Sequence, residues 1–223
     1  MKLEKWASFS LTHWRWLLPA GLCAFFVSVF LKLTSELFEG EFEAVDQLVR
    51  NFALSLRHES FNAQVVDLSS LGSGTVLTLF TLFSLLVFFL MGDRRGALAL
   101  LVGSMGAVFW TVVLKRLIAR PRPAADHLVD VGGHSYPSGH SLGSAAVYFL
   151  VAFLVIRHFR SNPARAAILT ATAFLVLLIG LSRLYLDVHY FSDVASGLSF
   201  GTGWACLVTS VFFVLRQRPG RRT

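Results

Sequence analysis

Long runs of apolar residues, separated by short polar stretches, dominate the chain. Six runs are long enough, or nearly so, to cross the hydrocarbon core of a bilayer, which takes about 20 residues of helix. They lie at about residues 16–33, 71–91, 96–114, 141–157, 166–182 and 194–215. The fourth and fifth runs are the shortest, so their ends are the least sharply defined. The pattern predicts an all-α integral membrane bundle of six transmembrane helices.

The segment 34–70, between the first two runs, follows a different pattern. Acidic residues gather at its start, and apolar residues such as Leu48, Phe52 and Phe61 then recur roughly along one helix face. This spacing predicts an amphipathic helix that lies on the membrane interface. A plain connector that packs over the bundle fits the pattern equally well, and either structure would shape the access of lipid.

The composition agrees with a membrane protein. Hydrophobic residues make up 55% of the 223 positions and charged residues only 15%, which is too apolar for an ordinary soluble domain. No linker rich in Ser, Gly or Pro divides the chain and no internal repeat is visible, so a single domain over 1–223 is expected. Cys23 and Cys206 each fall inside an apolar run and are interpreted as buried core residues, not metal ligands.

Positive charge is distributed unequally between the two sides of the predicted bundle. Six spans place both ends of the chain on one side, where twelve of the twenty Lys and Arg residues meet only two of the thirteen acidic residues. The positive-inside rule therefore puts both ends in the cytoplasm. The net charge of +7 is explained by loop arginines that face anionic lipid, since no nucleic-acid-binding module accompanies them. The first run is interpreted as an uncleaved helix instead of a signal peptide, because it is long and no clear cleavage site follows it.

Three short stretches hold nearly all of the chemically useful polar residues. Their sequences are KRLIARPRP at 115–123, PSGH at 137–140 and SRLYLDVHYFSD at 182–193. All three lie at or beyond helix ends on the predicted outer side, so they can converge at one membrane surface without burying charge at mid-bilayer. Two histidines and a carboxylate beside clustered Lys and Arg indicate phosphate chemistry.

The second and third stretches each have a catalytic and an ordinary structural interpretation. His189 and Asp193 are four residues apart, so on a helix the carboxylate can orient the imidazole for nucleophilic attack. A helix cap beside a packed histidine explains the same spacing. Ser138 and Gly139 precede an apolar run, where helix N-terminal amides bind anions and His140 can act as an acid. Pro-Ser-Gly is also common turn chemistry.

The first stretch is similarly ambiguous. Lys115 lies at the end of the third run, and Arg120 and Arg122 follow it around two prolines. Such cations suit phosphate recognition, but a cation that snorkels at the membrane edge is the simpler explanation for any one of them. Gly197 and Gly201 form a pattern that fits a helix-packing surface. Three residues between the first two stretches are expected to be solvated loop residues, with a position at the edge of the pocket as the alternative: His127, His134 and Tyr136.

In combination, the three stretches resemble the signature of the type 2 phosphatidic acid phosphatase (PAP2) superfamily. This superfamily includes the vanadium haloperoxidases and bacterial undecaprenyl-pyrophosphate phosphatases. The resemblance covers about residues 68–215, and no signature position departs from the pattern. The matching patterns are Lys115-x6-Arg122-Pro123, Pro137-Ser138-Gly139-His140 and Ser182-Arg183-x5-His189-x3-Asp193.

The resemblance implies a role for each matching residue. His189 would be the nucleophile that forms a phosphohistidine, Asp193 would orient it, and His140 would protonate the leaving group and then activate water. Three cations can neutralise the charge on the phosphoryl oxygens, and the signature has no carboxylate cluster for a metal, so neither a metal nor another cofactor is expected. The residues expected to bind the phosphate are Lys115, Arg122, Ser138, Gly139 and Arg183.

The expected function is that of a lipid phosphatase in the bacterial inner membrane, with its site on the periplasmic side. Candidate substrates are undecaprenyl pyrophosphate, phosphatidylglycerophosphate, phosphatidic acid and diacylglycerol pyrophosphate. The alternative is a phosphotransferase that moves the phosphate to lipid A or a glycan. A vanadate-dependent haloperoxidase is disfavoured because those relatives are soluble, and a transporter is disfavoured because the cations cluster at one edge. The expected partners are the lipid substrate and the bilayer, without nucleic acid, and the oligomeric state is left open.

Overall fold

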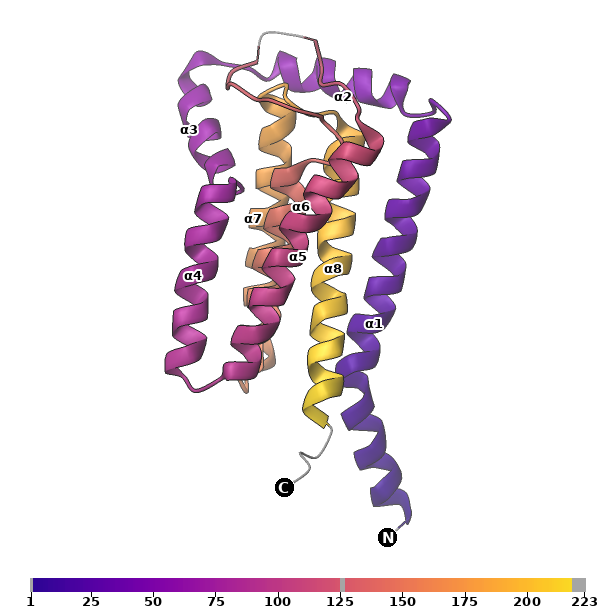
Figure 1. Ribbon diagram of the computed structural model, residues 1–223, viewed down its shortest axis with the longest axis vertical. Helices are drawn as coiled ribbons and strands as arrows, with labels where there is room; N and C mark the ends of the chain where they lie inside the picture. Colours follow the sequence, from indigo (N-terminus) through magenta and orange to yellow (C-terminus); the bar gives the residue numbers. More distant parts are fainter. Residues whose placement is uncertain (1, 125–126, 218–223) are drawn as a thin grey trace.

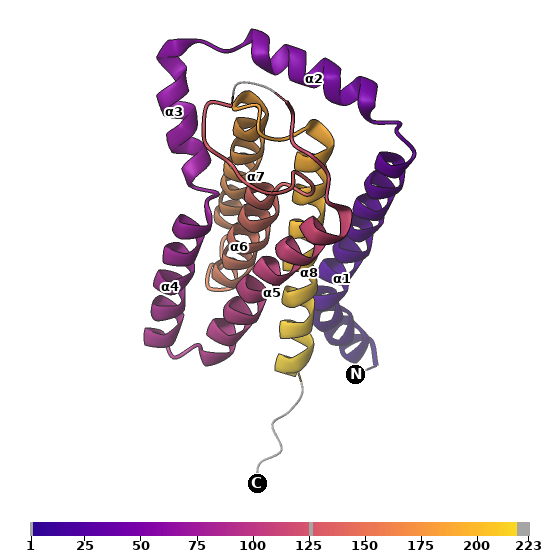
Figure 2. The ribbon, with the colours of Figure 1, turned by 45° about the horizontal axis from the view of Figure 1, so that its top comes forward.

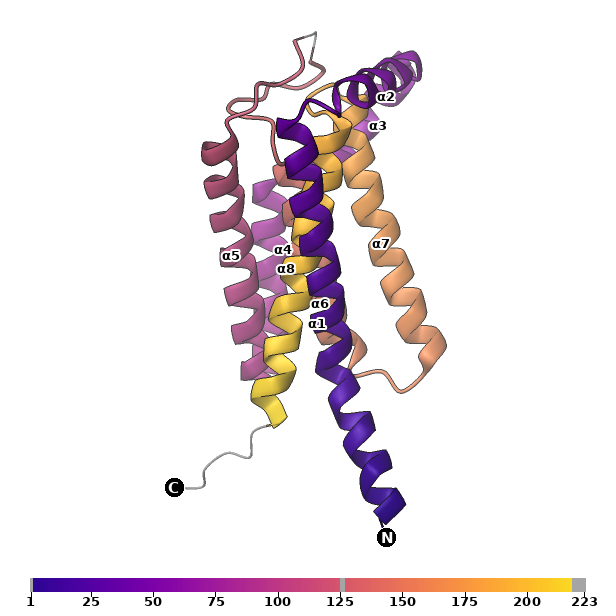
Figure 3. The ribbon, with the colours of Figure 1, turned by 90° about the vertical axis from the view of Figure 1, so that its right-hand side faces the viewer.

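The computed structural model describes residues 2–124 and 127–217, which form a bundle of helices without strands in these ranges (Figure 1). α1 begins and α8 ends at the same end of the bundle, while α2 and the loops that follow α5 and α7 lie at the other end (Figures 1 and 3). The helices are α1 (Lys2–Phe38), α2 (Glu43–Ser55), α3 (Glu59–Ser70), α4 (Gly74–Leu90), α5 (Arg94–Ile118), α6 (Gly139–Ile156), α7 (Asn162–Tyr185) and α8 (Phe191–Gln217).

Five of these helices are long and apolar enough to cross a membrane. α3 and α4 together pass the same test as a pair bent by 45°, which makes up to six spans in the described part of the chain. The bend lies at residues 71–73, where the Ser73 side chain accepts a hydrogen bond from the Val76 amide and so caps α4. The prediction of an all-α membrane bundle is therefore confirmed.

The segment 34–70 is divided differently from the prediction. α1 continues to Phe38, α2 crosses the end of the bundle, and α3 turns down to join α4 (Figure 2). On α2, Val49 and Ala53 pack against α7 and α8, whereas Leu48 and Phe52 are exposed. The amphipathic pattern thus describes α2 alone, and this helix also packs over the bundle as the connector interpretation expected.

α6 and α8 approach each other closely along a glycine seam formed by Gly197 and Gly201. A Cβ atom at Gly201 would lie 2.3 Å from the Leu142 carbonyl oxygen, and one at Gly197 would lie 2.7 Å from the Ser138 carbonyl oxygen. Only glycine permits such contact between helix backbones. The predicted packing surface is confirmed, and it joins two helices of the same chain so that their N-terminal ends meet.

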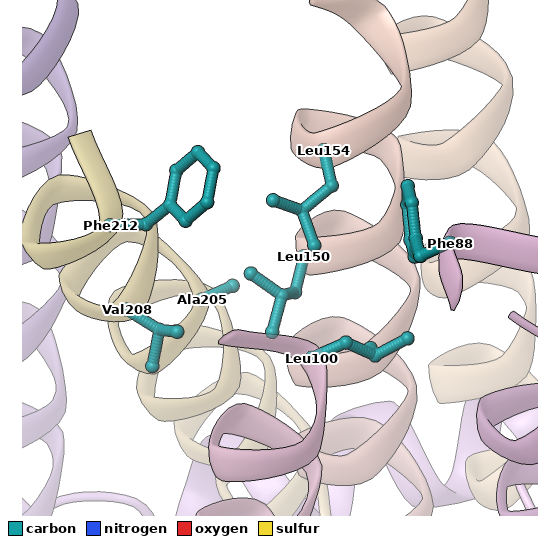
Figure 4. Close-up of a cluster of buried hydrophobic side chains, with 7 residues drawn as sticks. All are labelled: Phe88, Leu100, Leu150, Leu154, Ala205, Val208 and Phe212. Carbon is teal, nitrogen blue, oxygen red and sulfur yellow. The ribbon is translucent and has the colours of Figure 1, made fainter. Parts of the chain in front are cut away.

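The main apolar cluster lies toward the end of the bundle where α8 terminates, away from the N-termini of α6 and α8. Figure 4 shows this cluster, which is formed by side chains of α4, α5, α6 and α8: Phe88, Leu100, Leu150, Leu154, Ala205, Val208 and Phe212. Cys206 is buried as predicted, whereas Cys23 is only partly buried. The buried acidic and basic side chains lie at the other end of the bundle, and they include Asp46, Arg183, His189 and Asp193.

Candidate active site

The end of α5 carries Lys115 toward the loop that follows it. Ala119 ends the helix in the left-handed region, with φ of 49°, and turns the chain away from the helix axis. The Lys115 ammonium group donates to the carbonyl oxygens of His134 and Ser135. A Cβ atom at Gly139 would lie 3.7 Å from Lys115 Cε, so the N-terminus of α6 lies directly beside this lysine.

Arg122 lies in the same loop and faces His189. Its guanidinium donates to the carbonyl oxygens of Gly132 at 3.0 Å, Gly133 at 3.1 Å and Val188 at 2.7 Å. One terminal nitrogen also lies 3.4 Å from His189 Nε2. Because an arginine can only donate, Nε2 is the acceptor in this contact, which assigns the ring proton to Nδ1.

The Nδ1 side of His189 faces Asp193, in the first turn of α8. Nδ1 lies 3.3 Å from Asp193 Oδ2, which also accepts from the Tyr190 amide at 2.9 Å. The His189 side chain is 2% exposed and that of Asp193 is fully buried. Burial lowers the pKa of His189 to about 4, although Asp193 opposes the shift. At neutral pH the imidazole is therefore uncharged, with its lone pair on Nε2.

The PSGH stretch forms the N-terminus of α6, and the predicted helix cap is present there. The Ser138 hydroxyl oxygen accepts from the Ser141 amide and hydroxyl, while the Ser138 amide donates to the Asp193 carbonyl at 3.0 Å. His140 follows in the first turn and lies within electrostatic reach of Lys115 and His189. The capped N-terminus thus lies between the Lys115 stretch and the His189 stretch.

Arg183 comes from the last turn of α7 and is 4% exposed. It donates to the Ser69 hydroxyl at 2.7 Å, and its Nε is buried without a hydrogen-bond partner in the part of the chain that the structure describes. Arg183 interacts electrostatically with Arg122 and with His140. A buried donor among like charges is a site that favours an anion.

Arg120 has a different role from the neighbouring cations. It donates to Asp193 Oδ1 at 2.7 Å and to Asp46 Oδ2 at 2.8 Å, and its guanidinium lies 4.1 Å above the Tyr190 ring. The carboxylates hold the pKa of Arg120 above its ordinary value despite burial. The cluster contains four cations, Lys115, Arg120, Arg122 and Arg183. The two carboxylates bound by Arg120 offset two of these charges, so the cluster has a net charge of two positive units.

Sequence reasoning missed Asp46, which is 1% exposed. Its carboxylate also accepts from the Ser192 amide at 2.9 Å and the Ser192 hydroxyl at 2.7 Å. A signal was present, because Asp46 lies three and seven residues before Val49 and Ala53 and so shares their buried helix face.

The expectation for Tyr136 was wrong. Its side chain is fully buried, and its hydroxyl bonds to Ser196 at 2.7 Å and to Thr34 at 2.8 Å. His134 is exposed as expected, whereas His127 is partly buried and contacts the Pro123 carbonyl. Among the residues that the structure describes, no group of three His, Cys, Asp or Glu residues is placed to hold a metal ion.

Comparison with known proteins decides the family. The model of the PAP2 superfamily matches residues 96–217. Phosphatidylglycerophosphatase B of Bacillus subtilis is 31% identical over 186 residues, which cover 82% of this chain and 89% of the relative. The chain belongs to the PAP2 superfamily. The expected superfamily is thus confirmed, and the protein is a PAP2-type membrane lipid phosphatase.

Other PAP2 proteins match over shorter lengths. A lipid A 1-phosphatase of Rhizobium etli is 36% identical over 54% of this chain and 55% of the relative. A decaprenylphosphoryl-5-phosphoribose phosphatase of Mycobacterium tuberculosis is 35% identical over 53% of this chain and 62% of the relative.

A solved structure supports the same fold over nearly the whole chain. The crystal structure of a transmembrane PAP2-type phosphatidylglycerolphosphate phosphatase from Bacillus subtilis superposes with a TM-score of 0.81 and 25% identity. The superposition covers 89% of this chain and 98% of that one. LpxE of Aquifex aeolicus shares the fold with a TM-score of 0.57 at 24% identity, over 73% and 92% of the two chains.

Proposed function

We propose that the protein removes phosphate from a membrane lipid through a phosphohistidine at His189. One observation carries the proposal: Nε2 of a buried, uncharged His189 faces the Arg122 guanidinium, while Nδ1 faces Asp193. An imidazole held in this way has its free lone pair directed toward a cation that can bind the phosphoryl oxygens.

The reaction takes two displacements at phosphorus. In the first, Nε2 attacks, an N–P bond forms, the bond from phosphorus to the leaving oxygen breaks, and protonated His140 donates its proton to that oxygen. In the second, neutral His140 takes a proton from water as the water attacks phosphorus, the N–P bond breaks, and phosphate leaves. Asp193 stabilises the positive charge on His189 during both steps.

The phosphoryl group is held by charge and by amides. Lys115, Arg122 and Arg183 would bind its oxygens, and the excess of two positive charges in their cluster favours the phosphate dianion. The Gly139 amide at the N-terminus of α6 would add a donor along the helix dipole, and the Ser138 hydroxyl, which accepts from Ser141, would donate its own proton. These residues act mainly by positioning the group and by neutralising its charge in the transition state.

A groove beside the site supports a lipid substrate. It has a volume of about 610 Å³ between α4, α5 and α6, and it reaches Gly139 and His140. Most of its lining is apolar and includes Leu77, Leu101 and Val108. A hydrocarbon chain in this groove would place its phosphate next to the cations.

We also propose that the site faces the periplasmic side. The opposite end of the bundle carries Arg94 and Arg95 at the start of α5 and Arg157 and Arg160 just after α6, as the cytoplasmic side of a membrane protein does. The substrate would therefore enter from the outer leaflet.

Phosphatidylglycerophosphate is the proposed substrate. The match to phosphatidylglycerophosphatase B, which is named for this lipid, covers more than four fifths of each chain. Protein purified in detergent is compared on phosphatidylglycerophosphate, undecaprenyl pyrophosphate and phosphatidic acid, with and without a lipid A acceptor. We expect the highest kcat/KM on phosphatidylglycerophosphate, with the phosphate recovered in water. Capture of the phosphate by the acceptor would indicate a phosphotransferase.

The matched variants are His189→Ala and His158→Ala. His158 is exposed and lies at the opposite end of the bundle, so its replacement is expected to leave activity unchanged. His189→Ala is expected to abolish phosphate release from every lipid. Wild-type activity in His189→Ala would refute the phosphohistidine route.

A further inference from the structure

A second cavity lies at the end of the bundle opposite to the active site. It has a volume of about 500 Å³ and is bounded by α1, α6, α7 and α8. α7 diverges from α1 and α8 toward this end (Figure 3). The apolar side chains that line it are Leu18, Leu22, Phe153, Ile156, Leu169 and Phe213. The cavity offers room for hydrocarbon within one leaflet of the membrane.

Three arginines from three helices also line this cavity: Arg157, Arg165 and Arg216. Arg157 forms an ion pair with Asp93. Arg165 Nε donates to the Phe159 carbonyl at 2.8 Å. Neither Arg165 nor Arg216 has a carboxylate partner among the side chains that the structure describes. Two of the three positive charges are therefore uncompensated.

Arg157 also feels the charge of Arg216. Burial, and then the charge of Arg216, lowers the pKa of Arg157 to about 10. A single arginine at a membrane edge can snorkel to water and needs no partner. Three arginines around one apolar cavity instead match the phosphate of a lipid headgroup, which basic pockets between transmembrane helices bind on the cytoplasmic side.

Thr209 provides a polar group deeper in the same cavity. It is 2% exposed and lines the cavity, and its hydroxyl has no hydrogen-bond partner within the described ranges. It precedes Arg216 by seven residues of α8, which corresponds to about 10 Å of helix. A phospholipid with its phosphate near Arg216 carries ester carbonyls on the membrane side of that phosphate, and these can accept from a buried hydroxyl. Free phosphate has no such group.

We propose that this cavity binds one anionic phospholipid of the leaflet at the end of the bundle where α1 begins. The phosphodiester lies between Arg165 and Arg216, an ester carbonyl accepts from Thr209, and an acyl chain covers the apolar walls. The bound lipid joins the diverging end of α7 to α1 and α8. The site is separate from the catalytic end, so it does not depend on the lipid that the active site hydrolyses.

The test compares two variants that each remove two positive charges from the same end of the bundle. Arg165→Gln/Arg216→Gln changes the cavity, whereas Arg94→Gln/Arg160→Gln changes exposed residues that do not line it. Binding of phosphatidylglycerol is measured by native mass spectrometry, and thermal unfolding is measured in phosphatidylcholine nanodiscs with increasing phosphatidylglycerol. Phosphate release by each variant shows that its fold is intact.

We expect phosphatidylglycerol to raise the Tm of the wild type, and to bind the cavity variant roughly 30-fold more weakly. The surface variant should retain wild-type affinity. Equal weakening in both variants, or wild-type affinity in the cavity variant, would overturn the proposal. If the double cavity variant does not fold, Arg216→Gln alone is used, since this arginine is exposed.

Two further measurements separate a lipid from a free anion. Thr209→Val should weaken phosphatidylglycerol binding and leave the Tm shift given by inorganic phosphate unchanged, because only the lipid carries an ester carbonyl. Inorganic phosphate should give the same Tm shift in the wild type as in the cavity variant, because any phosphate bound at the active site is common to both. A phosphate-induced shift that disappears in the cavity variant would contradict the assignment to a lipid.

Discussion

Arg122 is fixed in place without being neutralised. Its hydrogen bonds run to the carbonyl oxygens of Gly132, Gly133 and Val188, and none of its bonds within the described chain is to a carboxylate. Carbonyl groups carry only partial charge, so the guanidinium keeps its positive charge for the substrate while its orientation is held. Burial lowers the pKa of Arg122, but a guanidinium remains protonated at any physiological pH.

Arg122→Lys is therefore expected to lower kcat by about 10²–10³-fold, because an ammonium group cannot reproduce the planar set of donors. Arg116→Lys is the matched control, since Arg116 is exposed in the last turn of α5. Steady-state phosphate release from lipid measures both variants. A kcat for Arg122→Lys within a factor of two of the wild type would show that the planar arrangement of guanidinium donors is unimportant for the reaction.

The pH dependence tests the environment of His189. A nucleophilic imidazole must be uncharged, and burial lowers the pKa of His189 to about 4. Activity should therefore persist below pH 6 and fall only as the pH approaches 4, instead of falling near the ordinary histidine value of about 6.5. The measurement is the pH dependence of kcat/KM, which reports titrating groups of the free enzyme, with folding monitored at each pH. An acid limb at pH 6.5 or above would contradict this environment.

α2 is connected to the catalytic end through buried charges. Asp46 on this helix binds Arg120, and Arg120 binds the carboxylate that faces His189. Arg50, one turn further on, forms a two-bond ion pair with Asp187 at 2.7 and 2.8 Å. A helix that lies across the end of the bundle thus contributes to the positions of the groups beneath it.

Asp46→Asn should lower kcat by about tenfold to 100-fold, as loss of an outer-shell partner does in metal sites, with little change in KM. Breaking a buried ion pair on one side should also cost about 3 kcal/mol of stability. Glu43→Gln on the same helix is the control, because Glu43 is exposed. Kinetics and thermal unfolding measure the two effects. Unchanged kcat in Asp46→Asn would assign Asp46 a purely structural role.

The glycine seam between α6 and α8 determines how close the two helix N-termini lie. Gly201→Ala would force a Cβ atom against the Leu142 carbonyl, so we expect a loss of about 1–3 kcal/mol of stability. Gly21→Ala, with open space around its Cβ position, should be neutral or slightly stabilising. Thermal unfolding in detergent compares them, and equal Tm values for the two variants would disprove close packing at the seam.

The sequence predicted features that depend on repeated patterns or on short motifs. Apolar runs predicted the spans, and the signature spacing predicted the residues that meet at Asp193 and His189. Arg120 and Asp46 were not predicted as partners, because 74 residues separate them and no periodicity links such contacts. Tyr136 was assigned to solvent because the loop around it is polar, while the structure buries its ring and satisfies its hydroxyl from α1 and α8.

The whole molecule divides its polar and apolar chemistry between two ends. The buried apolar cluster of Figure 4 lies toward the end where α8 terminates, and the cation cluster lies at the other end beneath α2. The groove between α4, α5 and α6 runs from Gly139 and His140, next to the cation cluster, along apolar side chains of these three helices. This arrangement suits a reaction in which a charged headgroup and an apolar tail must be held at the same time.

The most direct test of the phosphohistidine route is to trap the phosphoenzyme. Lipid labelled with ³²P is mixed rapidly with the wild type, His140→Ala and His189→Ala, quenched in alkaline detergent, and the labelled peptide is located by mass spectrometry. We expect an acid-labile label on His189 in the wild type and none in His189→Ala. In His140→Ala the label should form more slowly, because the leaving oxygen is no longer protonated, and should last longer, because water is no longer activated. Label on another residue, or turnover without any labelled protein, would contradict a phosphoryl transfer through His189.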